Sequence, residues 1–273
     1  MKGGEDMGNT INNEALVKDQ YKNSDNLNAR LNFHSFNINK TDWNQWFFEK
    51  MNMPDHGNIL ELGCGNGLLW KKNEKSIKKT LNITLSDFSE GMLESAKKNI
   101  NNENIKYEVI DIQNIPYEDE SFDVIIARHM LYHVPDIDKA LSEVKRVLKP
   151  NGKFYVSTNS LNHLRELKIL VKNFDKNIDF DPARDSSLFG IENGGELLKK
   201  HFGHVALEEF NGQIVVHEAE PVVSYVTSVI SVLQHIIDEN KLDSFTKYVE
   251  AEIDKTGEFT TSTGAGIFIA SNL

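Results

Sequence analysis

The chain contains few of the residues that cross-link a fold or turn it sharply. Its 273 residues include one cysteine, Cys64, and six prolines. A single cysteine cannot form an internal disulfide or supply a cysteine-rich zinc site. We therefore expect a reducing, cytoplasmic setting.

Positive charge and long apolar runs are also scarce. Thirty Lys and Arg residues oppose 41 Asp and Glu residues, a formal net charge of −11. This balance argues against sequence-independent binding to nucleic acid or anionic membranes, which depends on clustered cations. The longest apolar stretch, 222–233, contains Ser, Tyr and Thr residues and is too short for a membrane span, which needs about 20 residues. The N-terminus has no apolar run, so we predict no leader peptide.

Three regions differ in composition. Residues 1–20 are polar and Asn-rich, which predicts a flexible tail, and residues 21–56 carry aromatic anchors typical of a helical cap. From residue 57 to residue 273, strand and helix patterns alternate, which favours parallel pairing with right-handed crossovers. Strands are predicted at 58–62, 82–85, 105–110, 122–126 and 152–157, and helices at 68–77, 89–100 and 136–148.

The later part of the chain is less regular. We predict helices at 163–174 and 194–202, a strand at 205–210, helical structure over 221–253 and a last strand at 266–270. Together the patterns predict an α/β fold. It is a doubly wound, mostly parallel, seven-stranded Rossmann-like sheet with an antiparallel last strand. A helical cap precedes it, and a helical insertion at about 218–258 precedes the last strand.

A glycine-rich turn follows the first predicted strand, in the segment ILELGCGNG from Ile59. Gly63 and Gly65 permit a tight turn in which backbone amides approach a ligand. The spacing Gly63, Gly65, Gly67 is GxGxG, and the GxGxxG of NAD sites is absent. The turn indicates a nucleotide-type cofactor, and its spacing weakens the case for NAD.

Acidic residues end the next two strands. Asp87 stands 20 residues after Gly67, where a carboxylate can accept both hydroxyls of a ribose. Asp111 ends the third strand, where an acceptor suits an adenine amino group. Both could instead cap helices, and Cys64 between the glycines is typical of a small buried filler.

Because the glycine turn and the two acidic strand ends occur together, residues 57–158 resemble the class I S-adenosylmethionine-dependent methyltransferases of the methyltransferase-11 domain type. The matching segments are ILELGCGNG, SDFSEGML from Ser86, VIDIQNIPYEDESFDVIIARHMLYHV from Val109 and LSEVKRVLKPNGKFYVST from Leu141. The resemblance implies S-adenosyl-L-methionine as cofactor and S-adenosyl-L-homocysteine as product. It also assigns cofactor-binding residues: Gly63 and Gly65 behind the methionine moiety, Asp87 on the ribose, Phe88 and Met92 beside it, Asp111 and the Ile112 amide on adenine, and Arg128 near the sulfonium end.

The resemblance continues more weakly at both ends of this region. The segment YKNSDNLNARLNFHSFN from Tyr21 resembles the cap of a bacterial subgroup in which a Tyr and an Arg reach the cofactor, so Tyr21 and Arg30 are candidates. Packing or surface roles are equally compatible with both. The segment NSLNHLREL from Asn159 resembles that subgroup and a ribosomal RNA methyltransferase group. The RNA group carries a zinc finger whose cysteines are missing here.

Histidines supply the candidates for acid–base chemistry. His133 follows the fourth strand and His163 follows the fifth, at the sheet edge where a substrate must lie. Either could remove a proton from an acceptor. The alternatives are that His133 only orients its loop and that His163 and Glu166, predicted on one helix, form structural hydrogen bonds. No recognised ligand spacing predicts a metal site.

These observations favour an S-adenosylmethionine-dependent methyltransferase (EC 2.1.1 class) that transfers a methyl group to a small-molecule acceptor. We expect no nucleic acid or membrane partner, and a monomer or homodimer. The alternatives are an RNA or protein methyltransferase, which would show a basic surface beside its pocket, and a catalytically silent S-adenosylmethionine-binding protein, whose cavity would not reach the methyl group.

Overall fold

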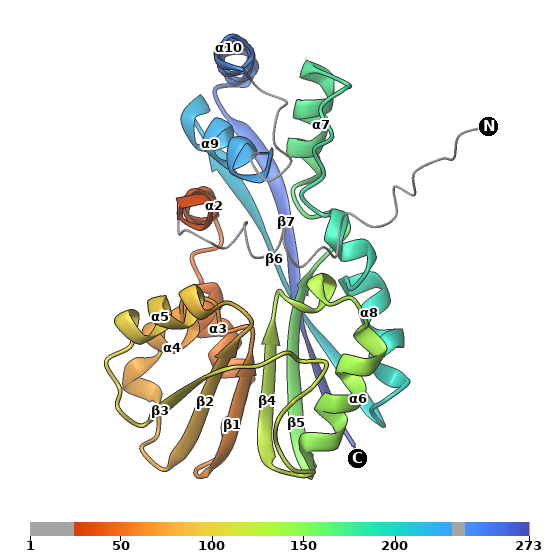
Figure 1. The fold of residues 1–273 in the computed structure, drawn as a ribbon. Coiled ribbons are helices and arrows are strands. Elements are labelled where there is room, and N and C mark those ends of the chain that lie inside the picture. The colour runs from red at the N-terminus through yellow and green to blue at the C-terminus, as the bar shows by residue number, and fades with distance from the viewer. Residues whose placement is uncertain (1–24, 231–237, 273) are drawn as a thin grey trace, which may run out of the picture.

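A computed structural model describes residues 25–230 and 238–272 (Figure 1). Tyr21, predicted to reach the cofactor, lies outside the described residues. Within them, no helix combines the length and the apolar character that a membrane crossing requires.

A single seven-stranded sheet forms the centre of the molecule. The strands are β1 (Gly57–Leu62), β2 (Leu81–Asp87), β3 (Ile105–Val109), β4 (Phe122–Arg128), β5 (Leu148–Asn159), β6 (His204–Val216) and β7 (Phe259–Ser271). Their order is β3-β2-β1-β4-β5-β7-β6. Strands β1 to β5 pair in parallel, and β7 runs antiparallel to both β5 and β6. The predicted fold class is confirmed.

Helices lie on both faces of this sheet and beyond its upper edge (Figure 1). They are α2 (Asp25–Ser35), α3 (Trp43–Lys50), α4 (Leu68–Lys72), α5 (Glu90–Asn99), α6 (Ile137–Val147), α7 (Arg165–Phe174), α8 (Ile191–Lys199), α9 (Ala219–Ile230) and α10 (Glu239–Thr256). Three short 3-10 helices are η2 (Glu74–Ser76), η3 (Leu131–His133) and η4 (Arg184–Ser187).

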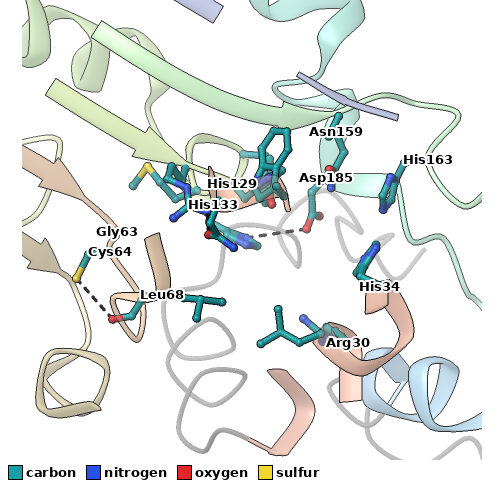
Figure 2. A pocket seen from close by; sticks show the side chains of 18 of the residues that line it. Arg30, His34, Gly63, Cys64, Leu68, His129, His133, Asn159, His163 and Asp185 are labelled. Carbon is teal, nitrogen blue, oxygen red and sulfur yellow. Dashed lines mark hydrogen bonds and ion pairs between the residues drawn. The ribbon is translucent and has the colours of Figure 1, made fainter. Parts of the chain in front are cut away.

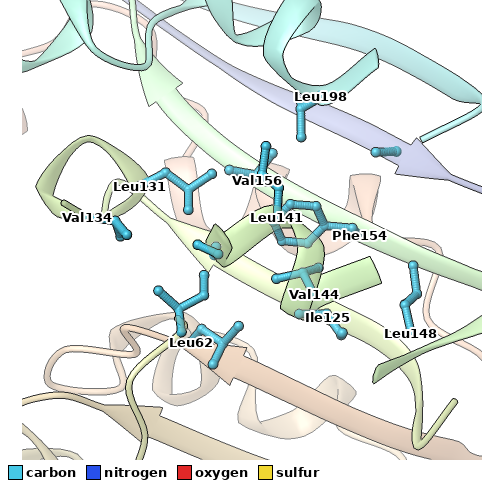
Figure 3. Close-up of a cluster of buried hydrophobic side chains, with 14 of the residues drawn as sticks. Leu62, Ile125, Leu131, Val134, Leu141, Val144, Leu148, Phe154, Val156 and Leu198 are labelled. Atoms are coloured by element: carbon cyan, nitrogen blue, oxygen red, sulfur yellow. The ribbon is translucent and has the colours of Figure 1, made fainter. Parts of the chain in front are cut away.

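The alternation of apolar side chains along the parallel strands builds two cores. Leu60 and Ile125 point to the face covered by α6 and α8, where Phe154 also packs (Figure 3). Ile59 and Val124 point to the opposite face and pack with residues of α3, α4 and α5. Burial on both faces explains why these strands appear in the sequence as nearly continuous apolar runs.

A third core lies beyond the upper edge of the sheet. Phe33 of α2 packs there with residues of α7, α9, α10 and the upper part of β6, including Tyr225, Ile214 and Phe245. We call this unit, made of α2, α7, α9, α10 and the upper halves of β6 and β7, the cap. Figure 1 shows it above the carboxyl ends of the parallel strands.

Two strands of the cap are longer than predicted. We predicted strands at 205–210 and 266–270, whereas β6 spans His204–Val216 and β7 spans Phe259–Ser271. Their upper halves contain polar residues and glycines, such as Gly212 and Gly264, which are weak strand formers. The two strands nevertheless pair without interruption from His204–Ser271 to Val216–Phe259, so each satisfies the other's backbone groups.

Candidate active site

The glycine turn lies at the topological switch point of the sheet. β1 is flanked by β2 and β4, so the chain winds away in opposite directions from its carboxyl end. Gly63 and Gly65 follow β1 with φ angles of 71° and 55°, in the left-handed region that favours glycine. A Cβ atom on Gly63 would also lie 3.0 Å from Cγ of Met130. The backbone conformation therefore favours glycine at both positions, and both glycines line the cavity.

Asp87 connects the ends of β2 and β1. Its Oδ2 accepts a hydrogen bond from the backbone N–H of Gly65 at 2.9 Å, and its Oδ1 accepts one from Ser89 at 2.9 Å. The cap of α5 is Ser89, whose side chain accepts from the N–H of Met92, so Asp87 does not cap the helix. Burial raises the pKa of Asp87, and the backbone N–H groups of Gly65, Phe88 and Ser89 oppose that shift.

The other residues predicted to contact the ribose and adenine line the same cavity. These are Phe88, Met92, Asp111 and Ile112. Met92 and Ile112 are buried, whereas Phe88 is exposed. Asp111 accepts a hydrogen bond from the N–H of Gln113 at 2.9 Å, which orders the turn after β3. The structure thus brings these side chains to one edge of the sheet.

Arg128 ends β4 and is fixed by polar and aromatic neighbours. Its Nη2 donates to Oδ1 of Asn44 at 2.8 Å, and its guanidinium lies 5.1 Å from the centroid of the Phe47 ring. Its Nη1 lies 3.9 Å from Oε1 of Glu61, a buried carboxyl whose Oε2 accepts from the indole N–H of Trp70. Burial raises the pKa of Glu61 to about 7, opposed by Arg128 and Trp70.

The cavity continues from the cofactor residues to the cap. Its volume is about 1360 Å³, large enough for a nucleoside-sized molecule and a second small molecule. Figure 2 shows the cap side, where Arg30 and His34 of α2 lie across from His129, His133 and Asn159. Arg30 donates from Nη2 to the carbonyl of Ser228 at 3.0 Å.

Four histidines line this part of the cavity. The His34 and His163 rings stack with centroids 5.5 Å apart, and His129 lies 5.4 Å from the ring of Trp43. Burial lowers the pKa of His34 to about 4, that of His129 to about 3 and that of His133 to about 4. Burial also lowers the pKa of His163. All four imidazoles are therefore neutral near pH 7 and are available as hydrogen-bonding groups.

His163 and Glu166 do not share a helix, contrary to our prediction. Leu164 has a φ angle of 55°, and α7 begins only at Arg165, so His163 lies in the turn before it. The N–H of Gly264 donates to Nδ1 of His163 at 3.3 Å. Glu166 accepts from the N–H of Ser262 at 2.8 Å, which joins α7 to β7. Glu166 therefore has the structural role that we had considered as an alternative.

With this geometry established, residues 60–156 match the family model described as a methyltransferase domain. The matched residues lie in the part of the chain that resembles the class I S-adenosylmethionine-dependent methyltransferases. The match begins within β1, contains β2, β3 and β4 and most of β5, and includes the glycine turn, Asp87, Asp111, Arg128 and His133.

Two curated relatives and one solved structure illustrate the similarity. Demethylmenaquinone methyltransferase of Lactobacillus johnsonii is 36% identical over 115 residues, 41% of this chain and 47% of the relative. Ubiquinone/menaquinone biosynthesis C-methyltransferase UbiE of Rickettsia akari is 35% identical over 150 residues, 52% of this chain and 59% of the relative. The chain thus spans about half the length of these relatives. Haemonchus contortus phosphoethanolamine N-methyltransferase 2, solved with S-adenosyl-L-methionine, gives a TM-score of 0.56 at 16% identity over 96% of this chain and 60% of that one.

The methyltransferase domain alone does not complete the cavity. Several of its lining residues come from outside 60–156 and were not predicted: Trp43, Asn159, Asp185, Phe210 and Tyr225. They lie in α3, at the end of β5, in η4, in β6 and in α9. Only Asn159 belongs to a segment that the sequence had marked. Among the residues that the structure describes, no group of three or more His, Cys, Asp or Glu side chains is arranged to hold a metal ion.

Proposed function

We propose that this chain is an S-adenosylmethionine-dependent methyltransferase that acts on a small-molecule acceptor. The observation that carries the proposal is the continuity of one cavity from the Gly63–Gly65 turn and Asp87 to the histidine-lined cap side. A protein that only bound the cofactor would have no use for the second compartment. The named activities of the relatives, which include quinone methylation, agree with a small-molecule acceptor.

The residues present fit S-adenosyl-L-methionine. A Cβ on Gly65 would meet no heavy atom within 4 Å, so its absence leaves room for a ligand against the turn, and the carboxylates of Asp87 and Asp111 provide acceptors for hydroxyl and amino groups. Arg128 lies beside them, near the predicted sulfonium end. When bound, this cofactor supplies a methyl carbon attached to a positively charged sulfur. Tyr21 and Arg30 remain proposed contacts from the N-terminal side.

The chain's own contribution is positioning and exclusion of water. The cap covers the carboxyl edge of the sheet, and the aromatic side chains of Trp43, Phe210 and Tyr225 form part of the wall. Holding an acceptor against a reactive carbon in a dry site can supply most of the acceleration of a displacement. We propose that His133 and His163 contact the acceptor, and that they do so without a bound metal ion.

The finer assignments follow from the same cavity. We propose that the protein acts as a monomer or homodimer in the cytoplasm and that nucleic acid is not its substrate, in keeping with its net charge of −11. We propose that the acceptor binds within the cavity and not in an open basic groove of the kind that nucleic acid needs.

Calorimetric titration tests the cofactor assignment. We expect S-adenosyl-L-methionine and S-adenosyl-L-homocysteine to bind and NAD not to bind.

A methyl-transfer screen with radiolabelled cofactor should then reveal a small-molecule product. His133→Ala should lower turnover while leaving cofactor affinity unchanged. Binding of NAD alone, or of no nucleotide, would contradict the proposal.

A further inference from the structure

His133 and Asp185 meet at the cap side of the cavity. Nδ1 of His133 lies 4.0 Å from Oδ2 of Asp185, with the His133 side chain 14% exposed and the Asp185 side chain 40% exposed. Their 3-10 helices, η3 and η4, pack against each other, and both residues line the cavity. Figure 2 shows the pair joined by a dashed line, with Asn159 and His163 on the far side of Asp185.

The carboxylate distinguishes His133 from the other cavity histidines. In the part of the chain that the structure describes, His34, His129 and His163 have no carboxylate within ion-pair distance, whereas His133 has Asp185. The other three acids between α7 and α8 are already paired, Asp175 with Lys241, Asp179 with Arg184 and Asp181 with Lys168. Asp185 is therefore the acid of this loop that faces a histidine.

A buried imidazole needs such a partner if it is to accept a proton. Burial and the Arg30 guanidinium lower the pKa of His133 to about 4, so an imidazolium is costly at this position unless a carboxylate approaches it closely. A carboxylate at Nδ1 offsets that cost and holds the proton on Nδ1, so that Nε2 keeps its lone pair. Arg184 and Arg30 favour the ionised form of Asp185, and Asp181 and burial oppose it.

We infer that Asp185 is a positioning residue that holds His133 as the proton acceptor for methyl transfer, and that the acceptor substrate is therefore one that carries an ionisable O–H or N–H group. The inference rests on the proposed function. The 4.0 Å separation is about 1 Å longer than a direct hydrogen bond, a looseness that is common before substrate binds.

The proton and electron balance is simple. The acceptor's O–H or N–H bond breaks, and its proton moves to Nε2 of His133. The electron pair left on the acceptor atom forms the new bond to the methyl carbon, while the carbon–sulfur bond breaks and its pair stays on sulfur. The imidazolium, stabilised by Asp185, then releases its proton to solvent. Acceptors that lose no proton on methylation, such as tertiary amines or thioethers, would gain nothing from this pair.

The tautomer of His133 tests the inference without any enzymatic assay. In protein with 15N-labelled histidine, long-range 1H–15N spectra near pH 7.5 should show the proton of His133 on Nδ1. Asp185→Asn should shift His133 toward the Nε2–H form, and Asp185→Glu should restore much of the wild-type signal. Asp181→Asn, a change of charge in the same loop, should leave the tautomer as it is. A wild-type His133 protonated on Nε2 would overturn the inference, even if the variants failed to fold.

Kinetics provide the second readout. Asp185→Asn should lower kcat for the identified acceptor about 100-fold with little change in KM, and should move the acidic limb of the kcat/KM profile. Equal profiles for wild type and Asp185→Asn would refute the positioning role. If the wild-type protein binds no S-adenosylmethionine, the proposed function fails, while the tautomer measurement still decides the pairing of His133 with Asp185.

Discussion

The backbone N–H of Gly65 donates to Oδ2 of Asp87 across 2.9 Å, so the turn after β1 and the end of β2 are fixed to each other. The Asp87 carboxylate therefore has two tasks. It holds the glycine turn in shape, and its remaining lone pairs face the cavity. Cofactor affinity should depend on it through both.

Replacement of Asp87 by Ala should weaken S-adenosylmethionine binding by about 10- to 100-fold, because hydrogen bonds to a charged group are lost. Calorimetry on the purified variant measures this directly. Asp55→Ala provides the control, since Asp55 is an exposed acid paired with Lys78. Equal affinity in Asp87→Ala and wild type would remove Asp87 from the cofactor site.

Two glycines near α5 should respond to alanine in opposite directions. At Gly67, φ is 74° and a Cβ would lie 2.5 Å from Cδ1 of Ile100, so Gly67→Ala should destabilise the protein by at least about 1–2 kcal/mol. At Gly91, inside α5, the nearest atom to a Cβ is Oγ of Ser89 at 3.8 Å. Gly91→Ala should therefore stabilise by about 0.5–1 kcal/mol. Urea unfolding compares the two, and a stabilising Gly67→Ala would contradict the backbone argument.

The cap should depend on Phe33 for its stability. Phe33 is fully buried, and its ring lies 4.8 Å from that of Tyr225. Truncation to Ala should cost about 3–5 kcal/mol in thermal or urea unfolding. Leu31, on the same helix, is 40% exposed, and Leu31→Ala should change stability by no more than about 0.5 kcal/mol. Similar losses of stability in Phe33→Ala and Leu31→Ala would show that burial of Phe33 in the cap core does not cause the loss.

Acid should destabilise the protein partly through His34. Burial lowers its pKa to about 4 in the folded state, below the usual 6.5. The unfolded chain therefore binds more protons between these values, and folding stability falls as the pH drops from about 6.5 to about 4. His34→Gln removes this component, so its stability should decline by about 2 kcal/mol less than that of wild type between pH 7 and pH 4.5.

The comparison of wild type with His34→Gln separates the contribution of His34 from those of groups whose titration changes the stability in the opposite direction. Glu61, whose pKa is raised to about 7, gains protons on folding and works the other way, but it is present in both proteins. Urea midpoints at several pH values provide the measurement. Parallel curves for wild type and His34→Gln would show that the imidazole titrates normally in the folded state.

Much of the cofactor side could be predicted because local chemistry marks it. Positive φ angles favour glycine at positions 63 and 65, Asp87 ends β2, and Asp111 lies two residues after the end of β3. Each of these residues is identified by its neighbours in the chain. The antiparallel last strand was predicted, whereas the order of the strands in the sheet was not.

The acceptor side could not be predicted in the same way. Asp185 lies in a short 3-10 helix between β5 and β6, and it faces His133 only because η3 packs against η4. Tyr225 is one of many apolar positions in α9, and nothing in the sequence separates it from its neighbours in the core. The positions of Asp185 and Tyr225 in the cavity depend on contacts between segments that are far apart in the chain, and a single sequence does not show such contacts.

The unbroken pairing of β6 with β7 has a mechanical consequence. From the Phe210–Ala265 pair to the Val216–Phe259 pair the hairpin rises six residues, about 20 Å. The lower part of this strand pair belongs to the central sheet, which we call its root, and its far end, the tip, leads into α9 and α10. A bend of a few degrees at the root would move the tip by more than about 1 Å. Small bends of the sheet therefore change the width of the cavity on its cap side while the glycine turn stays where it is.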